Sequence, residues 1–348
     1  MLKAEYQTRG PVPQDVIEAV PFDKPQLAEG EVLLEMLAAP INPSDVMTLT
    51  GIYGILPPLP AVGGNEGVGR VAEHGPNVTG PDIGQTVLLP VGCGTWATHI
   101  VAKASDLIPL PNEADPIQLA MVTINPPTAS LMLSEFVALQ PGDWVIQNAA
   151  NSGVGSYLIT FANMRGIKTV NVVRRESLVE PLTAAGADVV VVDGDDLADK
   201  VKEATGGADI RLGIDAVGGA ATDRLAATLA EGATLVNYGA LSGEPCHVSP
   251  IAIIFRDITL RGFWLAKWFN SATPEQQQAL YGKITGLVAT GKLSAPIHAT
   301  YKVQDIKEAV AVAAAGGRDG KVVLVGDSTG DSRRLTGQNP GRTQPDWP

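Results

Sequence analysis

Residues 144–166, "WVIQNAANSGVGSYLITFANMRG", place a short apolar strand, a turn of small residues and a helix in direct succession. A backbone turn that approaches a pyrophosphate closely needs small side chains, and the helix that follows points free N–H groups at the phosphates. The turn reads A-A-N-S-G-V-G rather than G-x-G-x-x-G, with Gly153 and Gly155 keeping it tight. The stretch therefore predicts a nucleotide-binding βαβ unit.

The alternation of strand and helix continues after this stretch. Short valine-rich runs alternate with longer runs of helical spacing. We expect strands at residues 168–174, 188–194, 210–219 and 233–239, and helices at residues 177–187, 196–207 and 221–232. Strands that alternate with helices of this length build a parallel sheet covered on both faces. The middle of the chain is therefore expected to be a doubly wound α/β domain of the Rossmann type.

Both ends of the chain have β character instead. Apolar runs separated by glycine, proline and asparagine favour a compact β barrel, and they lie at residues 31–41, 67–75, 84–91 and 96–104. Strand-like runs return at residues 295–303 and 320–327, with a helical run at 305–316. We expect one domain from residues 1–120 and 295–327, a nucleotide-binding domain from 121–294, and a polar tail at 328–348. A helical pattern over 115–139 is expected to break at Asn125-Pro126-Pro127.

The end of the second strand of this domain distinguishes two nicotinamide cofactors. An NAD site usually has an acidic residue about 20 residues after the glycine turn, where it accepts from ribose hydroxyls. Arg174 and Arg175 stand there, and guanidinium groups suit a 2′-phosphate. Two solvated arginines are the plainer interpretation, and Glu176 could favour NADH or pair with an arginine. The position of the arginines relative to the turn favours NADPH.

Composition argues against several other functions. The 348-residue chain has a formal net charge of −12, which is unsuited to sequence-independent binding of nucleic acid. No apolar run is long enough for a membrane span, and the first residues match neither a signal nor a transit peptide, so we expect a cytoplasmic protein. With two cysteines a four-cysteine zinc site is impossible, and the adjacent Cys246 and His247 are weak evidence for a metal. We expect no metal site.

Several longer strings make the chain similar to a known superfamily. They are INPSD (41–45), GIYGILPPLPAVGGNEGVG (51–69), LQPGDWVIQNAANSGVG (139–155), NVVR (171–174) and LRGFWL (260–265). Together they resemble the medium-chain dehydrogenase/reductase superfamily, and within it the zinc-independent trans-2-enoyl-CoA/acyl-carrier-protein reductases of the mitochondrial type. The resemblance extends from about residue 3 to residue 326. It implies a GroES-like β-barrel catalytic domain and a Rossmann nucleotide-binding domain.

The departures from the wider superfamily concern zinc. Zinc alcohol dehydrogenases carry a cysteine ligand in the first active-site loop and a His-Glu pair after a glycine. The corresponding places here read NPSD (42–45) and GGNEG (63–67), without cysteine or histidine. The resemblance therefore implies a reductase that does not use zinc to polarise a carbonyl.

Tyr53 is the residue whose role the resemblance changes most. From its surroundings alone, a tyrosine between Gly51 and Gly54 is more often a packing residue of its loop. The resemblance places it at the active-site tyrosine of the family. It implies that NADPH delivers hydride to the β-carbon of a 2-enoyl thioester, as in fatty-acid synthesis, and that Tyr53 donates a proton or stabilises the enolate oxygen. A phenol suits both roles because it stays protonated at neutral pH.

The resemblance implies further roles at matching positions. It places Asn42 and Trp264 at the substrate, Asn125 near the nicotinamide and Lys321 near the cofactor. The other cofactor-binding positions that it implies are Asn151, Ser152, Gly153, Val154, Arg174, Arg175, Tyr238, Gly239, Ala240, Leu241, Phe263, Trp264 and Leu265. Residue chemistry alone favours turn capping for Asn42 and Asp45, and core packing remains open for Phe263 and Trp264.

Two other functions remain open. A quinone oxidoreductase of the same superfamily shares the fold, the NADPH and the lack of zinc, whereas a non-catalytic NADPH-binding protein would have no need of the Tyr53 loop. For the enoyl reductase, the resemblance implies a substrate carried on CoA or acyl carrier protein. It also implies a homodimer, to which an exposed edge strand of the nucleotide domain could contribute.

Overall fold

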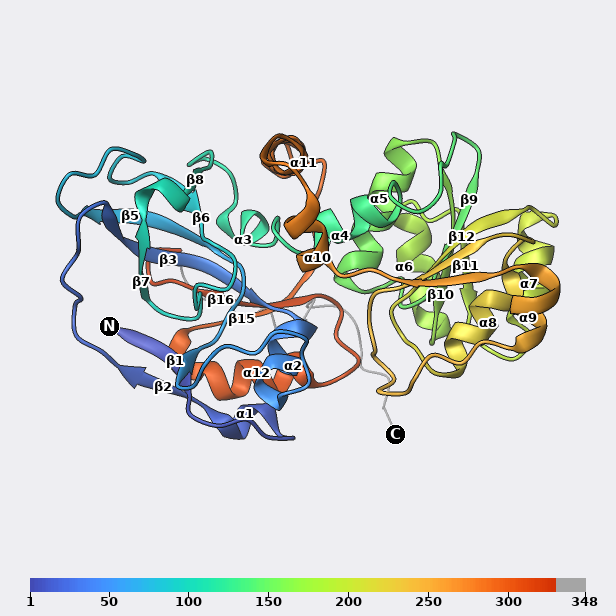
Figure 1. Ribbon diagram of the computed structural model, residues 1–348, viewed down its shortest axis with the longest axis horizontal. Helices are drawn as coiled ribbons and strands as arrows, with labels where there is room; N and C mark the ends of the chain where they lie inside the picture. The colour runs from blue at the N-terminus through green and yellow to red at the C-terminus, as the bar shows by residue number, and fades with distance from the viewer. Residues whose placement is uncertain (330–348) are drawn as a thin grey trace, which may run out of the picture. The chain divides into compact units, whose positions relative to one another are not determined.

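The computed structural model describes residues 1–329 and divides into two compact units (Figure 1). Within the described residues, the first unit comprises residues 1–123 and 287–329, and the second comprises residues 124–286. The first unit contains two sheets and the second contains one, and each unit has its own buried core. No helix among residues 1–329 is long and apolar enough to cross a membrane. The predicted polar tail lies, apart from its first two residues, outside the described part of the chain.

The first unit is built around a seven-stranded sheet and a three-stranded sheet. The larger sheet has the order β15-β16-β3-β5-β6-β8, and β7 pairs with β3. Its strands are β3 (Glu31–Ile41), β5 (Val68–His74), β6 (Thr86–Leu88), β7 (His99–Lys103), β8 (Ile108–Pro109), β15 (Ile297–Tyr301) and β16 (Lys321–Val325). The smaller sheet contains β1 (Leu2–Tyr6), β2 (Ile17–Pro21) and β4 (Ala61–Val62). Because β16 pairs antiparallel with β3, the end of the chain returns to the strands of its beginning.

Trp96 occupies the middle of the first core and constrains the loop after β4. The indole is fully buried, and its Nε1 donates to the Pro40 carbonyl at 3.3 Å. A Cβ added at Gly63 or Gly64 would lie 2.3 Å from Trp96 or Thr95 atoms respectively, so only glycine lets this loop pass. The unit also contains the helices α1 (Pro13–Val16), α2 (Pro43–Thr50), α3 (Pro116–Leu119) and α12 (Ile306–Ala314).

The second unit is a parallel sheet with helices on both faces. The strand order is β11-β10-β9-β12-β13-β14, and every pairing is parallel. The strands are β9 (Trp144–Gln147), β10 (Lys168–Val173), β11 (Val189–Val192), β12 (Ile210–Asp215), β13 (Thr234–Asn237) and β14 (Thr259–Gly262). The helices are α4 (Asn125–Met132), α5 (Gly153–Met164), α6 (Val179–Ala184), α7 (Leu197–Thr205), α8 (Ala220–Thr228), α9 (Pro250–Arg256), α10 (Leu265–Ser271) and α11 (Pro274–Ala289). The predicted doubly wound α/β domain is confirmed.

Apolar side chains fill both faces of this sheet. One cluster contains Ile146 and Val172 together with residues of α7, α8 and α9 such as Val201. Another contains Ile159 of α5 and Leu182 of α6. Coverage of both faces explains why every residue of β10 after Lys168 is buried, whereas the four valines of the edge strand β11 are half-buried.

The two prolines at residues 126 and 127 stand at the start of the second of two helices. The predicted break in the helical pattern is confirmed, because α3 ends at Leu119 and α4 starts anew at Asn125, with both prolines in its first turn. Proline lacks an N–H, but the first N–H groups of a helix have no partner within it, so proline is tolerated there.

Candidate active site

Four buried polar side chains and a half-buried asparagine form a cluster in the first unit. Asn42 precedes α2, Asp45 lies in its first turn, Asn65 and Glu66 follow β4, and Lys321 opens β16. Asn42 links two of its neighbours, because its Nδ2 donates to Glu66 Oε1 at 2.6 Å and its Oδ1 accepts from Lys321 Nζ. Asp45 accepts from Asn65 Nδ2 and from the Asn42 backbone N–H, both at 2.7 Å. The cluster therefore ties the start of α2 to the loop after β4 and to β16.

Burial shifts the protonation of two members of this cluster. Burial raises the pKa of Asp45 to about 6. Hydrogen bonds from Asn42 and Asn65 and the positive charge of Lys321 act in the opposite direction and lower this pKa, but they offset the effect of burial only in part. Burial lowers the pKa of Lys321 to about 8, although the negative charges of Glu66 and Asp45 act to raise it. The charged form of Asp45 is thus favoured by the hydrogen bond from the Asn42 backbone and by Lys321, and the charged form of Lys321 by Glu66 and Asp45.

The loop that carries Tyr53 follows α2 directly. Gly51 ends the helix with a left-handed φ of 84°, and Tyr53 is half-buried two residues later. The neighbouring Ile52 and Ile55 expose 70% and 57% of their surface. The Pro57 carbonyl farther along accepts a hydrogen bond from the Arg9 guanidinium, which fixes the far side of the loop. Tyr53 therefore stands on an apolar segment whose helix is anchored by the buried cluster.

The small-residue turn in the second unit closes tightly around the first turn of α5. Ser152 caps the helix, with its Oγ accepting from Gly155 N at 3.1 Å. A Cβ at Gly155 would lie 2.4 Å from the Ala150 carbonyl oxygen, so no larger residue fits. Ala149 takes a positive φ of 47° to make the turn. Asn151, Ser152 and Gly153 remain partly accessible at the start of the helix. The tight turn and the free N–H groups of α5 fit the pyrophosphate of a dinucleotide.

A buried carboxylate holds the strand ends beneath this turn. Asp215, at the end of β12, accepts from Asn148 Nδ2 at 2.6 Å, Thr222 Oγ1 at 2.7 Å and Asn237 Nδ2 at 3.0 Å. Although burial acts to raise it, these hydrogen bonds keep the pKa of Asp215 below its usual value. The sequence prediction missed Asn148 and Asp215, although a polar residue at the end of an apolar parallel strand was the available signal.

Two other predicted segments leave the same edge of the sheet. Residues 238–241 follow β13, where burial raises the pKa of the Tyr238 phenol, partly offset by a hydrogen bond with Ser152. A Cβ at Gly239 would lie 2.7 Å from the Ala216 carbonyl. Phe263 follows β14, donates its backbone N–H to Asn237 O at 2.9 Å and meets the Phe136 ring edge-on. Trp264 precedes α10 and exposes 40% of its surface.

The arginines at the end of β10 are available for a ligand. Arg174 and Arg175 are exposed, and neither side chain has a hydrogen bond or ion pair to a residue within the described chain. Glu176 begins the short helix η2 (Glu176–Leu178). Guanidinium groups that are free and solvent-facing fit a 2′-phosphate, so this edge of the sheet suits NADPH.

The structure thus gathers most of the predicted cofactor residues at the carboxyl ends of β9, β10, β13 and β14. This is the edge at which open α/β sheets bind ligands. Asn125, predicted near the nicotinamide, is the buried first residue of α4. Asn42 and Lys321, predicted at substrate and cofactor, belong to the buried cluster of the first unit.

Among residues 1–329, no three histidine, cysteine, aspartate or glutamate side chains lie close enough together to hold a metal ion. Cys246 is half-buried and free. The place of a zinc ligand in the GGNEG loop is taken by Asn65, which donates to Asp45.

Comparison with known proteins places both units in described families. Residues 28–112 match the family model "Alcohol dehydrogenase GroES-like domain", and residues 153–280 match "Zinc-binding dehydrogenase". These matches confirm the predicted GroES-like and Rossmann classes. The mitochondrial enoyl-[acyl-carrier-protein] reductases of Rattus norvegicus and Homo sapiens are each 39% identical to this chain, covering 86% of it and 82% of their own length.

Solved structures with the same fold include an enoyl thioester reductase and a putative quinone reductase. The Etr1p/NADP/crotonyl-CoA complex matches with a TM-score of 0.82 and 27% identity, covering 93% of this chain and 99% of that chain. A putative NADPH:quinone reductase from Bacillus thuringiensis matches with a TM-score of 0.84 and 30% identity, covering 93% and 98%.

The comparisons correct one prediction. The curated relatives are named as mitochondrial enzymes, which contradicts the cytoplasmic location expected from the sequence. Location depends on a targeting signal read before folding, and neither the composition of the folded units nor their site carries that information.

Proposed function

The chain belongs to the enoyl thioester reductases of the medium-chain dehydrogenase/reductase superfamily, and from this premise we propose how its residues carry out the reaction. The enzyme uses NADPH to reduce the 2,3 double bond of trans-2-enoyl thioesters, the reaction type of fatty-acid synthesis. The observation that carries the assignment is the carboxyl edge of the parallel sheet. There the Ser152–Gly155 turn offers a pyrophosphate site, and Arg174 and Arg175, which have no partner among residues 1–329, offer a 2′-phosphate site on the same domain.

When bound, NADPH supplies a hydride to the β-carbon of the substrate. The Tyr53 phenol donates a hydrogen bond to the thioester oxygen as enolate charge develops there, and the α-carbon is then protonated by Tyr53 or by water. A preorganised donor in a site shielded from water stabilises such charge more than bulk solvent does. The exposed apolar residues beside Tyr53 support shielding of this kind.

The other residues bind and orient. Asn151 to Val154 hold the pyrophosphate at the start of α5, and Arg174 and Arg175 hold the 2′-phosphate. Residues 238–241, residues 263–265 and Asn125 border the nicotinamide, with Trp264 also at the substrate. For Asn42 and Lys321, the hydrogen bonds within the buried cluster support a role in positioning α2 and, through it, Tyr53. We assign the catalytic role to the unit that contains residues 1–123 and 287–329, and nucleotide binding to residues 124–286.

The acyl carrier and the assembly are further proposals. We propose that both CoA and acyl carrier protein deliver the enoyl group, because the relatives are named for the carrier protein and Etr1p was solved with crotonyl-CoA. We also propose a homodimer. The edge strand β14 is exposed along its length, and the adjacent α9 exposes Ile251, Ile254 and Phe255, which a second copy could cover.

A quinone reductase is the second candidate, because the likeness to the putative quinone reductase is as high as that to Etr1p.

The proposed reaction is tested by following NADPH oxidation with 2-enoyl-CoA of short and long chains and identifying the saturated acyl-CoA by mass spectrometry. Saturated product with NADPH, and much slower turnover with NADH, is the expected result. Consumption of NADPH without saturated product would remove the assignment.

A further inference from the structure

We propose that the ion pair between Asp193 and Arg224 sets the preference for a 2′-phosphorylated nucleotide. In this view Arg224 neutralises a carboxylate that stands beside the phosphate-binding arginine Arg174. Arg224 is thus a positioning residue for the cofactor site, although it comes from a helix on one face of the sheet. The inference rests on the cofactor part of the proposed function.

The strand register brings Asp193 next to Arg174. The strands β10 and β11 are parallel neighbours, with Val173 opposite Val192. Asp193 N donates to the Val173 carbonyl at 2.8 Å, so Arg174 and Asp193 are the residues that leave two adjacent strands at the same edge. In NAD sites a carboxylate about 20 residues after the glycine turn accepts the ribose hydroxyls; Arg174 holds that place here, and Asp193 adds a carboxylate at the end of the neighbouring strand. An uncompensated Asp193 would therefore oppose the choice of NADPH.

Arg224 removes that opposition by occupying both carboxylate oxygens. From α8, its Nε donates to Asp193 Oδ1 at 2.8 Å and its terminal nitrogen to Oδ2 at 2.7 Å. Gly194 N also donates to Oδ1, at 2.9 Å. The two side chains are only 28% and 19% exposed, and partial burial strengthens a two-bond pair of this kind. The geometry leaves Asp193 satisfied and Arg174 with its charge available.

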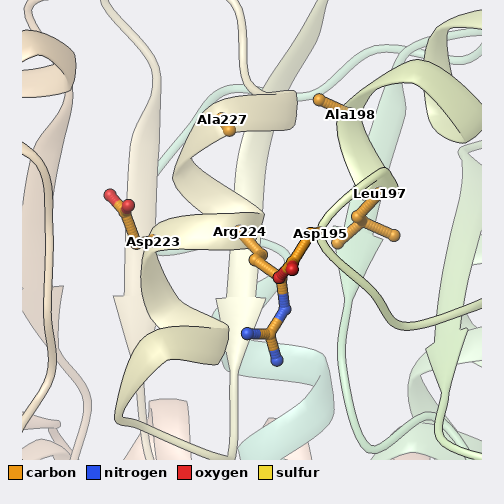
Figure 2. Close-up of a pocket in the computed structure, with 6 residues that line it drawn as sticks. All are labelled: Asp195, Leu197, Ala198, Asp223, Arg224 and Ala227. Carbon is orange, nitrogen blue, oxygen red and sulfur yellow. The ribbon is translucent and has the colours of Figure 1, made fainter.

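Other charges around the pair make the compensation necessary. A surface pocket of about 260 Å³ is lined by Asp195, Leu197, Ala198, Asp223, Arg224 and Ala227. Figure 2 shows Arg224 extending from its helix toward Asp195, whereas Asp223 points to the other side of that helix. Arg224 is the one basic residue among these six, beside two carboxylates. Asp223 accepts from Ser249 N at 2.6 Å, while Lys200 pairs with Asp196. Without Arg224, Asp193 would lose the basic side chain with which it pairs.

A double-mutant cycle tests the proposal by isothermal titration with 2′,5′-ADP and ADP as probes, without enoyl substrate. We expect Arg224→Gln to weaken 2′,5′-ADP binding about tenfold or more and to leave ADP binding unchanged or tighter, because like charges in a binding site are costly. We expect Asp193→Asn to bind like the wild type. In the double variant, removal of the carboxylate should restore binding of 2′,5′-ADP to near the wild-type value.

Three results would overturn the inference. A double variant as weak as Arg224→Gln would mean that Arg224 contacts the phosphate itself. Equal weakening of both nucleotides in Arg224→Gln would mean a structural effect, and no weakening would mean that the pair is irrelevant. Turnover of 2-enoyl-CoA by the wild type tests the proposed reaction separately. The inference about Arg224 can therefore fail while the proposed reaction stands, and the reverse.

Discussion

At the scale of single residues, the reaction depends most on the Tyr53 hydroxyl. Tyr53→Phe keeps the ring on its loop and removes the donor. We expect kcat for enoyl-thioester reduction to fall by roughly 10² to 10³-fold, the usual cost of losing one oxyanion donor. NADPH binding, followed by cofactor fluorescence, should be unchanged. Tyr301→Phe, on β15, is the matched control and should retain activity. Full turnover in Tyr53→Phe would remove the phenol from the mechanism.

The buried Asp45 carboxyl makes stability depend on pH in a defined direction. Its pKa is about 6 in the folded protein and near 3.8 ordinarily, so the folded state holds the proton more tightly than the unfolded state. The stabilisation this gives is complete below about pH 4 and is lost as pH rises through about 6. We compare the free energy of unfolding of the wild type with that of Asp45→Asn. The difference, wild type minus variant, should therefore decrease by about 2 to 3 kcal/mol as the pH rises from about 4 to above 6. Urea denaturation at several pH values measures it, and a difference that rises instead would contradict the assignment.

Residue roles were predictable from sequence only where a local rule applied. The small residues at 153 and 155 and the arginines after β10 follow from what a phosphate requires. The Asn42–Glu66–Lys321 contacts could not be predicted, because they join positions 24 and 279 residues apart in the chain. The roles proposed for individual site residues remain predictions.

At the scale of elements, the turn before α5 is the least tolerant feature. Gly155→Ala would place a methyl group 2.4 Å from the Ala150 carbonyl, so strand and helix must separate. We expect a loss of about 1 to 3 kcal/mol in unfolding free energy, together with weaker NADPH binding because the helix N–H groups move. Gly282→Ala, on α11 with open space at its Cβ, is the control; it should leave NADPH binding unchanged and raise the unfolding free energy by about 0.5 to 1 kcal/mol rather than lower it. An unchanged nucleotide affinity in Gly155→Ala would separate the turn from the phosphate site.

Element prediction succeeded where hydrophobic periodicity was strong. The strand expected at residues 31–41 coincides with β3. The helix expected after the small-residue turn is α5, which begins at Gly153. The three residues of β6 and the two of β8 are too short for such a pattern. The exposed strand β14 gives no apolar signal of burial, and the prolines at 126 and 127 signal a helix start as readily as a break.

At the scale of the whole molecule, the exposed edge of the second unit predicts self-association. Replacing Leu260 of β14 by lysine places a charge within the proposed interface. We expect sedimentation equilibrium to show a dimer for the wild type and a monomer for Leu260→Lys, since edge lysines oppose strand pairing. Ile83→Lys changes an apolar residue of the first unit that is more exposed than Leu260, 62% against 40%, and should remain dimeric. A monomeric wild type would exclude the proposed assembly.

The fold class of the whole chain was predictable because strand and helix periodicities differ between its ends and its middle. Its location was not, since the residues that build the folded units do not encode it.

The central claim, reduction of enoyl thioesters, is tested most directly by the ratio of kcat/KM for crotonyl-CoA to that for a benzoquinone, both measured with NADPH. We predict a ratio well above one, accompanied by formation of butyryl-CoA. A ratio well below one, with the quinone as the preferred acceptor, would contradict the account.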